Sequence, residues 1–484
     1  MSKGHPRHAE AHFDLVVIGG GSAGLTAART AGRLGARTLL VERERLGGDC
    51  LWTGCVPSKA LLHVAAEVQA ARNAARYGLI APSGPADLAA AMTHVKRAIG
   101  AIEPHDSADS LHSLGIEVAY GGAEFTSPRT LRVRNGVSPA RAGSRAWGSE
   151  VAFRFALIAT GSAPVLVPVP GLAEARPLTS DTVWDLDALP DRLVVLGGGP
   201  IGCELGQAFA RLGSTVTVVE AMERLLPHEE PRASQIVRER LEAEGVTVLT
   251  GHRAEKVADG ALHGPTGAVA FDALLAVTGR RANTAGLGLE VAGVEVAEHG
   301  EVRVDDRLRT SNPRIYAAGD VTGKSAFTHL GGVQGGAAAV DALLGVRRRI
   351  DYGAAPWVTY TDPEVARVGA VSADGARTLT LAHDRVDRAV ADGRTDGFTS
   401  LVLDRRGRIV GATVVAPRAG ETIAHLAAAV RLGWTPSQYA KTVHPYPSYT
   451  DGPWHAALTG VYARLAETRK VTGALMGLRR RGRS

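Results

Sequence analysis

The stretch FDLVVIGGGSAGLTAARTAGRLGARTLLVERE at residues 13–44 returns in altered form as DRLVVLGGGPIGCELGQAFARLGSTVTVVEAME at residues 191–223. The two copies align at a single offset of 178 residues, which carries Gly19 onto Gly197. Each copy opens with an apolar run, bends at glycines, continues as an Ala-rich amphipathic stretch and ends in a β-branched run. This order predicts a strand–turn–helix–strand unit, so we expect an α/β protein that contains the unit twice.

Both units carry a glycine pattern that suits a dinucleotide. The first glycine permits a tight turn, the second lets a pyrophosphate approach the backbone, and the third lets helix and strand pack closely. The helix then turns its N–H groups and positive dipole end toward the phosphates, and an acid after the second strand can accept both ribose hydroxyls. Two complete copies predict that the protein holds two dinucleotides, or one dinucleotide twice. The residues concerned are Gly19, Gly21, Gly24 and Glu42, and then Gly197, Gly199, Gly202 and Glu220.

The remaining segments are placed around this repeat. ALIATG at 156–161 predicts a buried strand ending at a glycine, and the proline-rich PVLVPVPG at 164–171 suggests a crossing between domains. TSNPRIYAAGD at 310–320 predicts a turn, a short strand and an exposed acid, Asp320. From about Asp351 the pattern changes to alternating strands with a helical stretch near 420–433, which predicts a separate α+β domain.

Composition and charge exclude several classes of protein. Hydrophobic residues make up 45% of the 484 residues and charged residues 21%, as in a globular protein with an ample core. The net charge of +6 is matched by six cations near the end of the chain, where no acid occurs, so a nucleic-acid groove is not expected. A solvated basic end is the preferred interpretation. The six cations are Arg469, Lys470, Arg479, Arg480, Arg481 and Arg483.

The N-terminus and the cysteines bear on location. Residues 1–12 lack the apolar stretch of a signal peptide, and no uncharged apolar run approaches the ~20 residues that span a bilayer. Three cysteines are too few for a secreted disulfide framework and match no zinc spacing, so no metal site is expected. We therefore expect a cytoplasmic protein without a membrane span. The third cysteine, Cys203, is predicted to serve only helix packing.

The other two cysteines, Cys50 and Cys55, lie close together in GGDCLWTGCVPSKALL. Pro57 suits a first helical turn, so the pair is predicted to lie at a helix N-terminus with Lys59 one turn further on. Both features stabilise a thiolate, which favours a redox role over simple packing.

The segment GGDCLWTGCVPSK resembles the redox-disulfide signature of the flavin-dependent pyridine-nucleotide disulfide oxidoreductases. The resemblance runs from about Phe13 to Asp451 and includes both glycine motifs, ATG at 159–161, TSNPRIYAAGD, and PWVTYTDPEVARVG of the dimerisation domain. ARLGSTVTV, RTLTL and APRAGETI are most similar to mercuric reductases within that family.

The resemblance implies two Rossmann-like dinucleotide-binding domains and a C-terminal α+β dimerisation domain. The implied boundaries are 12–165 and 299–350 for the two parts of an FAD-binding domain, 166–298 for an NAD(P)-binding domain, 351–470 for the dimerisation domain and 471–484 for a basic tail.

The same resemblance implies an FAD-dependent oxidoreductase that passes electrons from NAD(P)H through the flavin to a Cys50–Cys55 disulfide and on to an acceptor. Cys55 would be the charge-transfer thiolate beside the flavin, and Cys50 the interchange thiol that faces the substrate. Lys59 and Glu204 would form an ion pair near the flavin ring. The implied cofactor-binding residues are Gly19, Gly21, Gly24, Glu42, Lys59, Thr160, Gly161, Gly197, Gly199, Gly202, Glu220, Gly279, Asp320, Thr328 and His329.

The resemblance implies a particular role for several of these residues. Asp320 would hold the ribitol region of FAD, and a helix starting near Thr328–His329 would point its N-terminus at the flavin and stabilise negative charge there. The carboxylate of Glu220 favours the free 2′-hydroxyl of NADH, although Arg224 lies close enough to keep NADPH possible. A homodimer is implied because in this family the C-terminal residues complete the other subunit's site.

One stretch departs from the family pattern. The disulfide reductases carry a His–Glu dyad in a pattern like HPTxSE, whereas this chain has HPYPSYTD at residues 444–451. Aligned on the proline and the acid, Tyr446 stands in place of the histidine and Asp451 in place of the glutamate. A phenol with a pKa of ~10 is a poor base near pH 7, and mercuric reductases also resemble this chain in having tyrosine there. They differ in having a C-terminal cysteine pair and an extra N-terminal metal-binding domain.

Three hypotheses follow. The first is a mercuric-reductase-like enzyme that reduces a metal ion, quinone or other small acceptor that needs no general base. The second is a dihydrolipoamide-dehydrogenase-like disulfide reductase in which Tyr446 or His444 replaces the dyad. The third is a flavin-binding redox sensor in which the Cys50–Cys55 pair reports the oxidant state.

Overall fold

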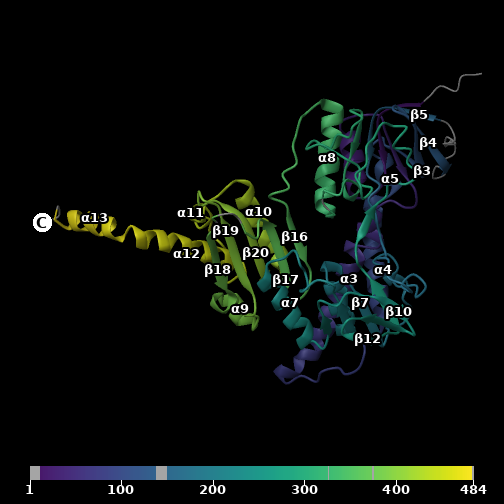
Figure 1. Ribbon diagram of the computed structural model, residues 1–484. Coiled ribbons are helices and arrows are strands. Elements are labelled where there is room, and N and C mark those ends of the chain that lie inside the picture. The colour runs from purple at the N-terminus through teal and green to yellow at the C-terminus, as the bar shows by residue number, and fades with distance from the viewer. Residues whose placement is uncertain (1–10, 138–149, 325, 373–374, 376, 482–484) are drawn as a thin grey trace, which may run out of the picture.

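The structure, a computed structural model, describes residues 11–137, 150–324, 326–372, 375 and 377–481. Of the five sheets in this part of the chain, the three largest organise the fold (Figure 1). The first sheet has the order β1-β2-β3-β4-β5-β15, with an additional pairing of β1 and β5. Its strands are β1 (Ala11–Ile18), β2 (Thr38–Glu42), β3 (Glu117–Ser127), β4 (Thr130–Val137), β5 (Glu150–Ile158) and β15 (Ile315–Ala317).

Both faces of this first sheet are buried. Alternate residues of β1 belong to different apolar clusters, with Val16 and Ile18 in one and Leu15 and Val17 in the other. Such burial on two faces is typical of parallel strands, and β1 pairs in parallel with both β2 and β5. Helices α1 (Ser22–Arg33) and α8 (Thr328–Leu344) pack against each other beside this sheet.

The second sheet is fully parallel and has the order β13-β7-β8-β9. It comprises β7 (Arg192–Leu196), β8 (Thr215–Val219), β9 (Thr247–Leu249) and β13 (Ala273–Ala276), with helices α6 (Pro200–Leu212) and α7 (Pro231–Ala243). Its first strand pair repeats the register of the first sheet: Ile18 faces Val41 there and Leu196 faces Val219 here. The two predicted strand–turn–helix–strand units are therefore present and equivalent in register.

The third sheet is antiparallel and has the order β16-β17-β20-β19-β18. It comprises β16 (Pro356–Thr359), β17 (Glu364–Gly369), β18 (Arg377–Ala382), β19 (Phe398–Leu403) and β20 (Ile409–Ala416) and is covered by α10 (Ala419–Arg431). This agrees with the predicted α+β region, including the helix expected near 420–433. Helix α12 (Asp451–Glu467) packs its first half against β18 and β19, and its second half and α13 (Arg469–Arg481) extend away from the sheets at the C-terminal end (Figure 1).

The remaining elements connect these layers. Helices α2 (Gly48–Trp52), α3 (Cys55–Asn73) and α4 (Leu88–Ile102) follow β2, and α3 packs against α4 and α6. No helix in the described ranges is long and apolar enough to cross a membrane. The other short elements are α5 (Ala108–His112), β6 (Ser162–Pro164), β10 (Lys256–Ala258), β11 (Ala261–Gly264), β12 (Gly267–Ala270), β14 (Arg280–Ala282), α9 (Asp387–Asp392) and α11 (Pro436–Tyr439).

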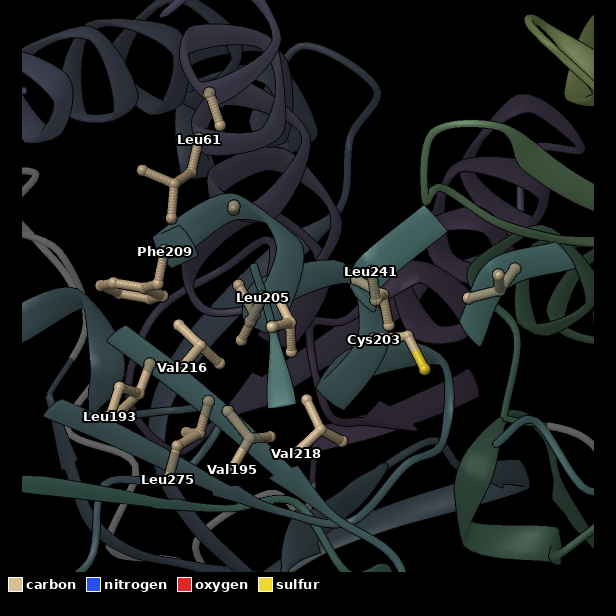
Figure 2. Packing of buried hydrophobic residues seen from close by; sticks show 14 of the residues in the cluster. Leu61, Leu193, Val195, Cys203, Leu205, Phe209, Val216, Val218, Leu241 and Leu275 are labelled. Atoms are coloured by element: carbon tan, nitrogen blue, oxygen red, sulfur yellow. The ribbon is translucent and has the colours of Figure 1, made fainter. Parts of the chain in front are cut away.

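Cys203 lies in the apolar core between α6 and the second sheet (Figure 2). It is completely buried, and its Sγ lies 3.3 Å from the carbonyl oxygen of Gly198. Burial raises the pKa of its thiol, which keeps the sulfur protonated. The residue therefore packs a helix, as the sequence predicts.

Candidate active site

The two sulfur atoms of the cysteine pair are held on different helices. Cys55 is the first residue of α3, whereas Cys50 lies in the separate short helix α2. The sequence predicted both at one helix N-terminus, and the difference arises at Gly54, whose backbone leaves the helical conformation between them. Both cysteines are thiols in this structure, so the interaction between them is a hydrogen bond.

The two thiols differ in acidity. The hydrogen bond from Cys50 lowers the pKa of Cys55 to about 6, against the opposing effect of burial and with further help from Thr328 and the charge of Lys59. The same hydrogen bond, together with burial, raises the pKa of Cys50. The negative charge therefore resides on Cys55 near neutral pH.

The N-terminus of α8 faces Cys55. This helix begins at Thr328, where the family resemblance implied a helix start, and Thr328 Oγ1 lies 3.2 Å from Cys55 Sγ. The next residue, His329, uses Nε2 to contact the carbonyl oxygen of Pro356 at 2.8 Å, which ties the helix to β16. At Gly335, a Cβ would lie 2.0 Å from the carbonyl oxygen of Ala23, so glycine is required for α8 to approach α1.

A cation lies one turn beyond Cys55. Lys59 Nζ is 2.9 Å from Glu204 Oε2 on α6, and Glu204 is almost fully buried. The second oxygen of Glu204 accepts a hydrogen bond from the backbone N–H of Tyr360 at 2.8 Å. The ring centroid of Tyr360 is 4.3 Å from Lys59 Nζ, which places the ammonium over the aromatic face. Sequence reasoning missed Tyr360.

The first glycine turn leaves space at one glycine only. A Cβ on Gly24 would lie 1.8 Å from the carbonyl oxygen of Gly19, whereas one on Gly21, the N-cap of α1, would meet only Gly48 Cα at 3.8 Å. The carboxylate of Glu42 accepts hydrogen bonds from the N–H groups of Gly20 at 2.6 Å and Glu44 at 2.8 Å. The turn is thus closely packed at its first and third glycines and open at its second, which fits a pyrophosphate.

A cavity of about 440 Å³ adjoins this turn. It lies at the carboxyl ends of β1 and β2, where ligands of parallel sheets bind. Its wall includes Gly19, Glu42, Thr160 and Asn283. Thr160 Oγ1 donates to the Asn283 carbonyl oxygen at 2.7 Å, and Asn283 Nδ2 donates back to the Thr160 carbonyl oxygen at 3.0 Å. These two bonds hold the Thr160–Gly161 corner against the second nucleotide unit.

The second glycine turn repeats this geometry. A Cβ on Gly202 would lie 1.9 Å from the Gly197 carbonyl oxygen, whereas one on Gly199 would meet no atom within 4 Å. Glu220 accepts hydrogen bonds from Gly198 N–H at 2.7 Å and Met222 N–H at 2.8 Å.

Arg224 was expected to lie close enough to influence the choice of nicotinamide cofactor. Its guanidinium instead donates to the carbonyl oxygens of Pro227 at 2.6 Å and Glu229 at 3.0 Å. The cation is therefore engaged within its own loop.

A polar group around Asp320 joins β14 to the helix that carries Cys50. Ser162 Oγ donates to Asp320 Oδ2 at 2.8 Å, and Arg280 Nε donates to Ser162 Oγ at 2.8 Å. The same guanidinium pairs with Asp49, the neighbour of Cys50. Ser162 and Arg280 were not predicted; the only signal was that Arg280 directly follows Gly279.

The C-terminal stretch behaves differently from the expected dyad. The hydroxyl of Tyr446 donates to Asp387 Oδ2 at 2.6 Å, and this bond raises the pKa of the phenol, which is 71% exposed. The buried carboxylate of Asp451 instead accepts from Ser448 N–H at 3.2 Å. Within the described residues, no hydrogen bond joins Tyr446 to Asp451 or brings either to the cysteine pair of the same chain.

His444 packs against the rings of Tyr439 and His425, with centroids 5.4 and 6.0 Å away. Burial, followed by the nearby His425, lowers the pKa of His444, so the imidazole stays neutral.

Comparison with protein families assigns nearly the whole chain. The profile described as pyridine nucleotide-disulphide oxidoreductase matches residues 13–340, and that of the same family's dimerisation domain matches residues 355–457. The protein belongs to the pyridine nucleotide-disulphide oxidoreductases. As a member, it is an NAD(P)H-dependent flavoenzyme with a redox-active cysteine pair, and FAD and NAD(P)H are the cofactors of the family.

This oxidoreductase is similar to several curated relatives over most of its length. A mercuric reductase of Streptomyces lividans is 38% identical over 467 residues, which cover 93% of this chain and 97% of the relative. A dihydrolipoyl dehydrogenase of Geobacillus stearothermophilus is 34% identical over 92% of this chain and 95% of the relative.

Among solved structures, LpdA of Mycobacterium tuberculosis matches with a TM-score of 0.82 at 29% identity, covering 93% of this chain and 99% of that one. The Cu(II) complex of RclA, a HOCl-induced flavoprotein disulfide reductase of Escherichia coli, matches with a TM-score of 0.79 at 28% identity and the same coverage.

Proposed function

We propose that this oxidoreductase carries electrons from NADH to a soft metal ion of the mercuric class through Cys50 and Cys55. The observation that carries the proposal is the phenol of Tyr446, which donates a hydrogen bond to Asp387 and has a raised pKa. It occupies the position at which the resemblance sets the imidazole base of the disulfide reductases. A phenol held in this way is a poor base, and a soft ion bound by two thiolates needs none.

The residues of this chain supply the electrostatics. Cys55 would carry the thiolate, stabilised by the thiol of Cys50, by Thr328 at the start of α8 and by the charge of Lys59. Glu204 would hold Lys59 close to the flavin. FAD, when bound, supplies the relay between hydride and sulfur. In the balanced reaction, NADH gives two electrons and becomes NAD⁺ with release of one proton, and a mercuric ion takes both electrons and leaves as elemental mercury.

We also propose the division of the chain and the choice of cofactor. Residues 12–165 and 299–350 would bind FAD, residues 166–298 would bind NADH, residues 351–470 would form a homodimer, and 471–484 would be a basic tail. NADH is preferred over NADPH because Glu220 would repel a 2′-phosphate and Arg224 is engaged by backbone carbonyls. In the homodimer, Tyr446 and Asp451 of one subunit would complete the site of the other.

Two other functions stay as alternatives. Similarity to dihydrolipoyl dehydrogenase favours a disulfide reductase, in which Tyr446 or His444 would serve as the base. His444 suits this role poorly, because it packs against Tyr439 and His425 inside its own domain. The second alternative is a redox sensor that uses the same cysteine pair without turnover of a dedicated acceptor.

An acceptor panel on the purified holoenzyme tests the proposal. NADH oxidation is followed without oxygen in the presence of mercuric ion, cupric ion, oxidised lipoamide or glutathione disulfide. The wild type is compared with Cys50→Ser and with Cys203→Ala, whose buried sulfur lies outside the redox pair. We expect mercuric turnover in the wild type and Cys203→Ala and at least a hundredfold loss in Cys50→Ser.

Other outcomes of the acceptor panel would support one of the alternative functions or exclude the cysteine pair. Turnover of lipoamide without mercuric ion would establish the disulfide reductase. Flavin reduction by NADH with no acceptor found would support the sensor. Full activity of Cys50→Ser with the best acceptor would remove the cysteine pair from the reaction path.

A further inference from the structure

One aromatic residue of the dimerisation domain lies close to the cysteine pair. Tyr360 directly follows β16 in the sequence and contacts both members of the Lys59–Glu204 ion pair. Its backbone N–H donates to Glu204 Oε1 at 2.8 Å, while Lys59 Nζ lies 2.9 Å from Glu204 Oε2 and 4.3 Å from the centre of the Tyr360 ring. The ammonium is thus held between a carboxylate and an aromatic face.

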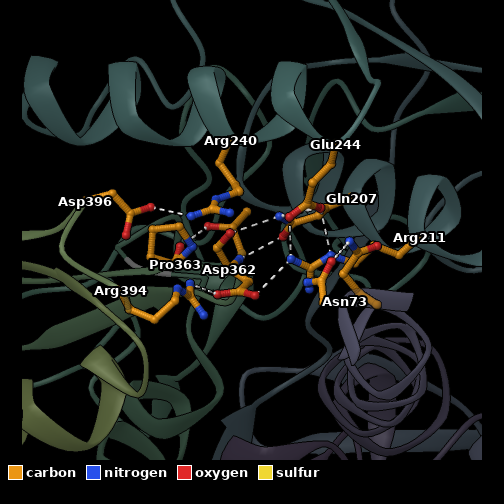
Figure 3. A network of polar contacts seen from close by, with 11 residues as sticks. Asn73, Gln207, Arg211, Arg240, Glu244, Asp362, Pro363, Arg394 and Asp396 are labelled. Carbon is orange, nitrogen blue, oxygen red and sulfur yellow. Dashed lines mark hydrogen bonds and ion pairs between the residues drawn. The ribbon is translucent and has the colours of Figure 1, made fainter. Parts of the chain in front are cut away.

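The segment that carries Tyr360 is itself fixed from both sides (Figure 3). Gln207 accepts from the N–H of Asp362 at 2.8 Å and donates to its carbonyl oxygen at 3.0 Å. The carboxylate of Asp362 pairs with Arg211 of the second nucleotide unit at 2.9 Å and also with Arg394 of the dimerisation domain. These contacts, together with the bond from Tyr360 N–H to Glu204, restrain the backbone that places the ring of Tyr360 beside Lys59.

Lysine needs such a second contact for geometric reasons. Its ammonium ends a flexible four-carbon stem and can satisfy a carboxylate from several rotamers. A ring face on one side of the ammonium selects among these positions and adds a favourable interaction with the cation. Burial, followed by the charges of Glu364, Glu204, Cys55 and Glu421, raises the pKa of the Tyr360 phenol, so the ring stays neutral.

We propose that Tyr360 is a positioning residue for the redox centre, which fixes the ammonium of Lys59 near Cys55 and keeps the charge of Glu204 neutralised. The proposal rests on the proposed function only in that Cys55 is the thiolate of the electron path. The groups that act on Cys55 are Cys50 on α2, Thr328 on α8, Lys59 on its own helix and Glu204 on α6. Lys59 and Glu204 affect its acidity in opposite directions, so a displaced Lys59 leaves the effect of Glu204 uncompensated.

The test measures the acidity of Cys55 directly in the full-length protein. The cysteine pair is first reduced with a phosphine, which is then removed, and the rate at which iodoacetamide alkylates Cys55 is followed from pH 4.5 to 9, with mass spectrometry to distinguish Cys55 from Cys50. Tyr360→Phe retains the ring, Tyr360→Leu and Tyr360→Met remove it, and Lys59→Met removes the cation. Tyr462→Leu is the matched control, because Tyr462 is exposed on α12.

We expect Lys59→Met to raise the midpoint of alkylation most. Tyr360→Leu and Tyr360→Met should raise it by about half a pH unit, which lowers the alkylation rate at pH 5 about threefold, because the cation–π contact is lost. Tyr360→Phe and Tyr462→Leu should match the wild type. If one ring-less variant does not fold, the other supplies the measurement, since Tyr360 is 39% exposed and leaves no closed cavity.

Two results would overturn the proposal. In the first, Lys59→Met shifts the midpoint and both ring-less variants leave it unchanged; in the second, Lys59→Met itself has no effect. Alkylation needs neither nucleotide nor acceptor. Absence of mercuric turnover alongside the expected shifts would therefore refute the proposed acceptor and leave the role of Tyr360 standing.

Discussion

At the scale of single residues, the two neighbouring thiols divide their roles by acidity. Cys55 begins a helix, receives a hydrogen bond from Cys50 and lies near Lys59, and its pKa falls to about 6. Cys50 donates that hydrogen bond and stays protonated. An electrophile or an arriving soft ion therefore meets one thiolate and one thiol at neutral pH.

This division predicts the effect of removing the donor. Alkylation of Cys55 in the wild type should rise with pH through a midpoint near 6, because the pKa is lowered and the thiolate is populated above it. In Cys50→Ala the midpoint should move upward by at least one unit toward the ordinary thiol value of ~8.5. Rates of iodoacetamide labelling as a function of pH give both midpoints, with Cys203→Ala as the control. Equal midpoints in wild type and Cys50→Ala would contradict the assignment.

Glu220 makes the second prediction at this scale. Its carboxylate lies at the end of β8 and would repel a 2′-phosphate. Glu220→Ala should lower the KM for NADPH relative to that for NADH. The ratio of kcat/KM for NADPH to kcat/KM for NADH should therefore rise about tenfold or more. Glu42→Ala, the equivalent change in the first unit, should leave this ratio unchanged while it weakens FAD retention. An unaltered NADH preference in Glu220→Ala would show that another residue selects the cofactor.

At the scale of elements, the repeated turn uses three glycines for two purposes. The third glycine of each turn lies against a carbonyl oxygen, at Gly24 and Gly202, so a side chain there would collide with backbone. The second glycine, Gly21 or Gly199, borders open space, so a side chain there would meet only a ligand. The same residue type thus serves packing at one position and binding at the other.

The two positions should respond differently to a single methyl group. Gly24→Ala should destabilise the protein by ~1–3 kcal/mol or more, because the Cβ would lie 1.8 Å from the Gly19 carbonyl oxygen. Gly21→Ala should unfold at nearly the same temperature as the wild type when both lack FAD, yet bind FAD more weakly. Thermal unfolding of the apoprotein and fluorescence titration with FAD separate the two effects. A large loss of apoprotein stability in Gly21→Ala would contradict this division.

At the scale of the whole molecule, a buried ion-pair network joins the second nucleotide unit to the dimerisation domain (Figure 3). Arg211 is 5% exposed and pairs with Glu244 at 2.6 Å and Asp362 at 2.9 Å. Burial alone would raise the pKa of Asp362, but Arg394 and Arg211 outweigh it and hold that pKa below its usual value. The network therefore makes the relative position of two domains depend on charge.

Loss of Arg211 should be costly because it leaves the nearly buried carboxylate of Glu244 without its cation, whereas Asp362 keeps its pair with Arg394. Arg211→Met should destabilise the protein by ~3–5 kcal/mol, whereas Arg388→Met, which breaks an exposed pair with Asp392, should leave the unfolding temperature nearly unchanged. Thermal unfolding at pH 7 measures both. A pKa lowered by folding stabilises the protein above the unfolded value of ~3.9 and less so as pH falls through the folded one. The contribution of Asp362 should thus diminish below about pH 4, and equal losses in the two arginine variants would contradict the network's role.

Sequence reasoning succeeded where a signal is local. The repeated glycines and Glu42 and Glu220 predict two equivalent units because each unit is continuous in sequence, and the strand registers agree with that prediction. The start of α8 at Thr328 was implied by the family resemblance and not by a local signal. The family signature around Cys50 and Cys55 is equally compact.

Contacts between distant segments were beyond local patterns. Tyr360 meets Glu204 across 156 residues, and Tyr446 meets Asp387 across 59, so neither partner has a motif that could reveal it. Both contacts depend on how whole elements pack. The basic end was predicted to be solvated from its charge alone, and Arg479 and Arg480 are exposed; its helix, α13, was not predicted.

The paired bonds of Glu42 and Glu220 to their own turns have one more consequence. Each carboxylate oxygen accepts one backbone N–H and retains a second lone pair. Because folding has already restrained these side chains, an arriving sugar would meet two acceptors in fixed directions. Binding would then cost little further conformational entropy of the glutamates. The side chains that would meet a nucleotide at either turn are therefore already held in place by the fold.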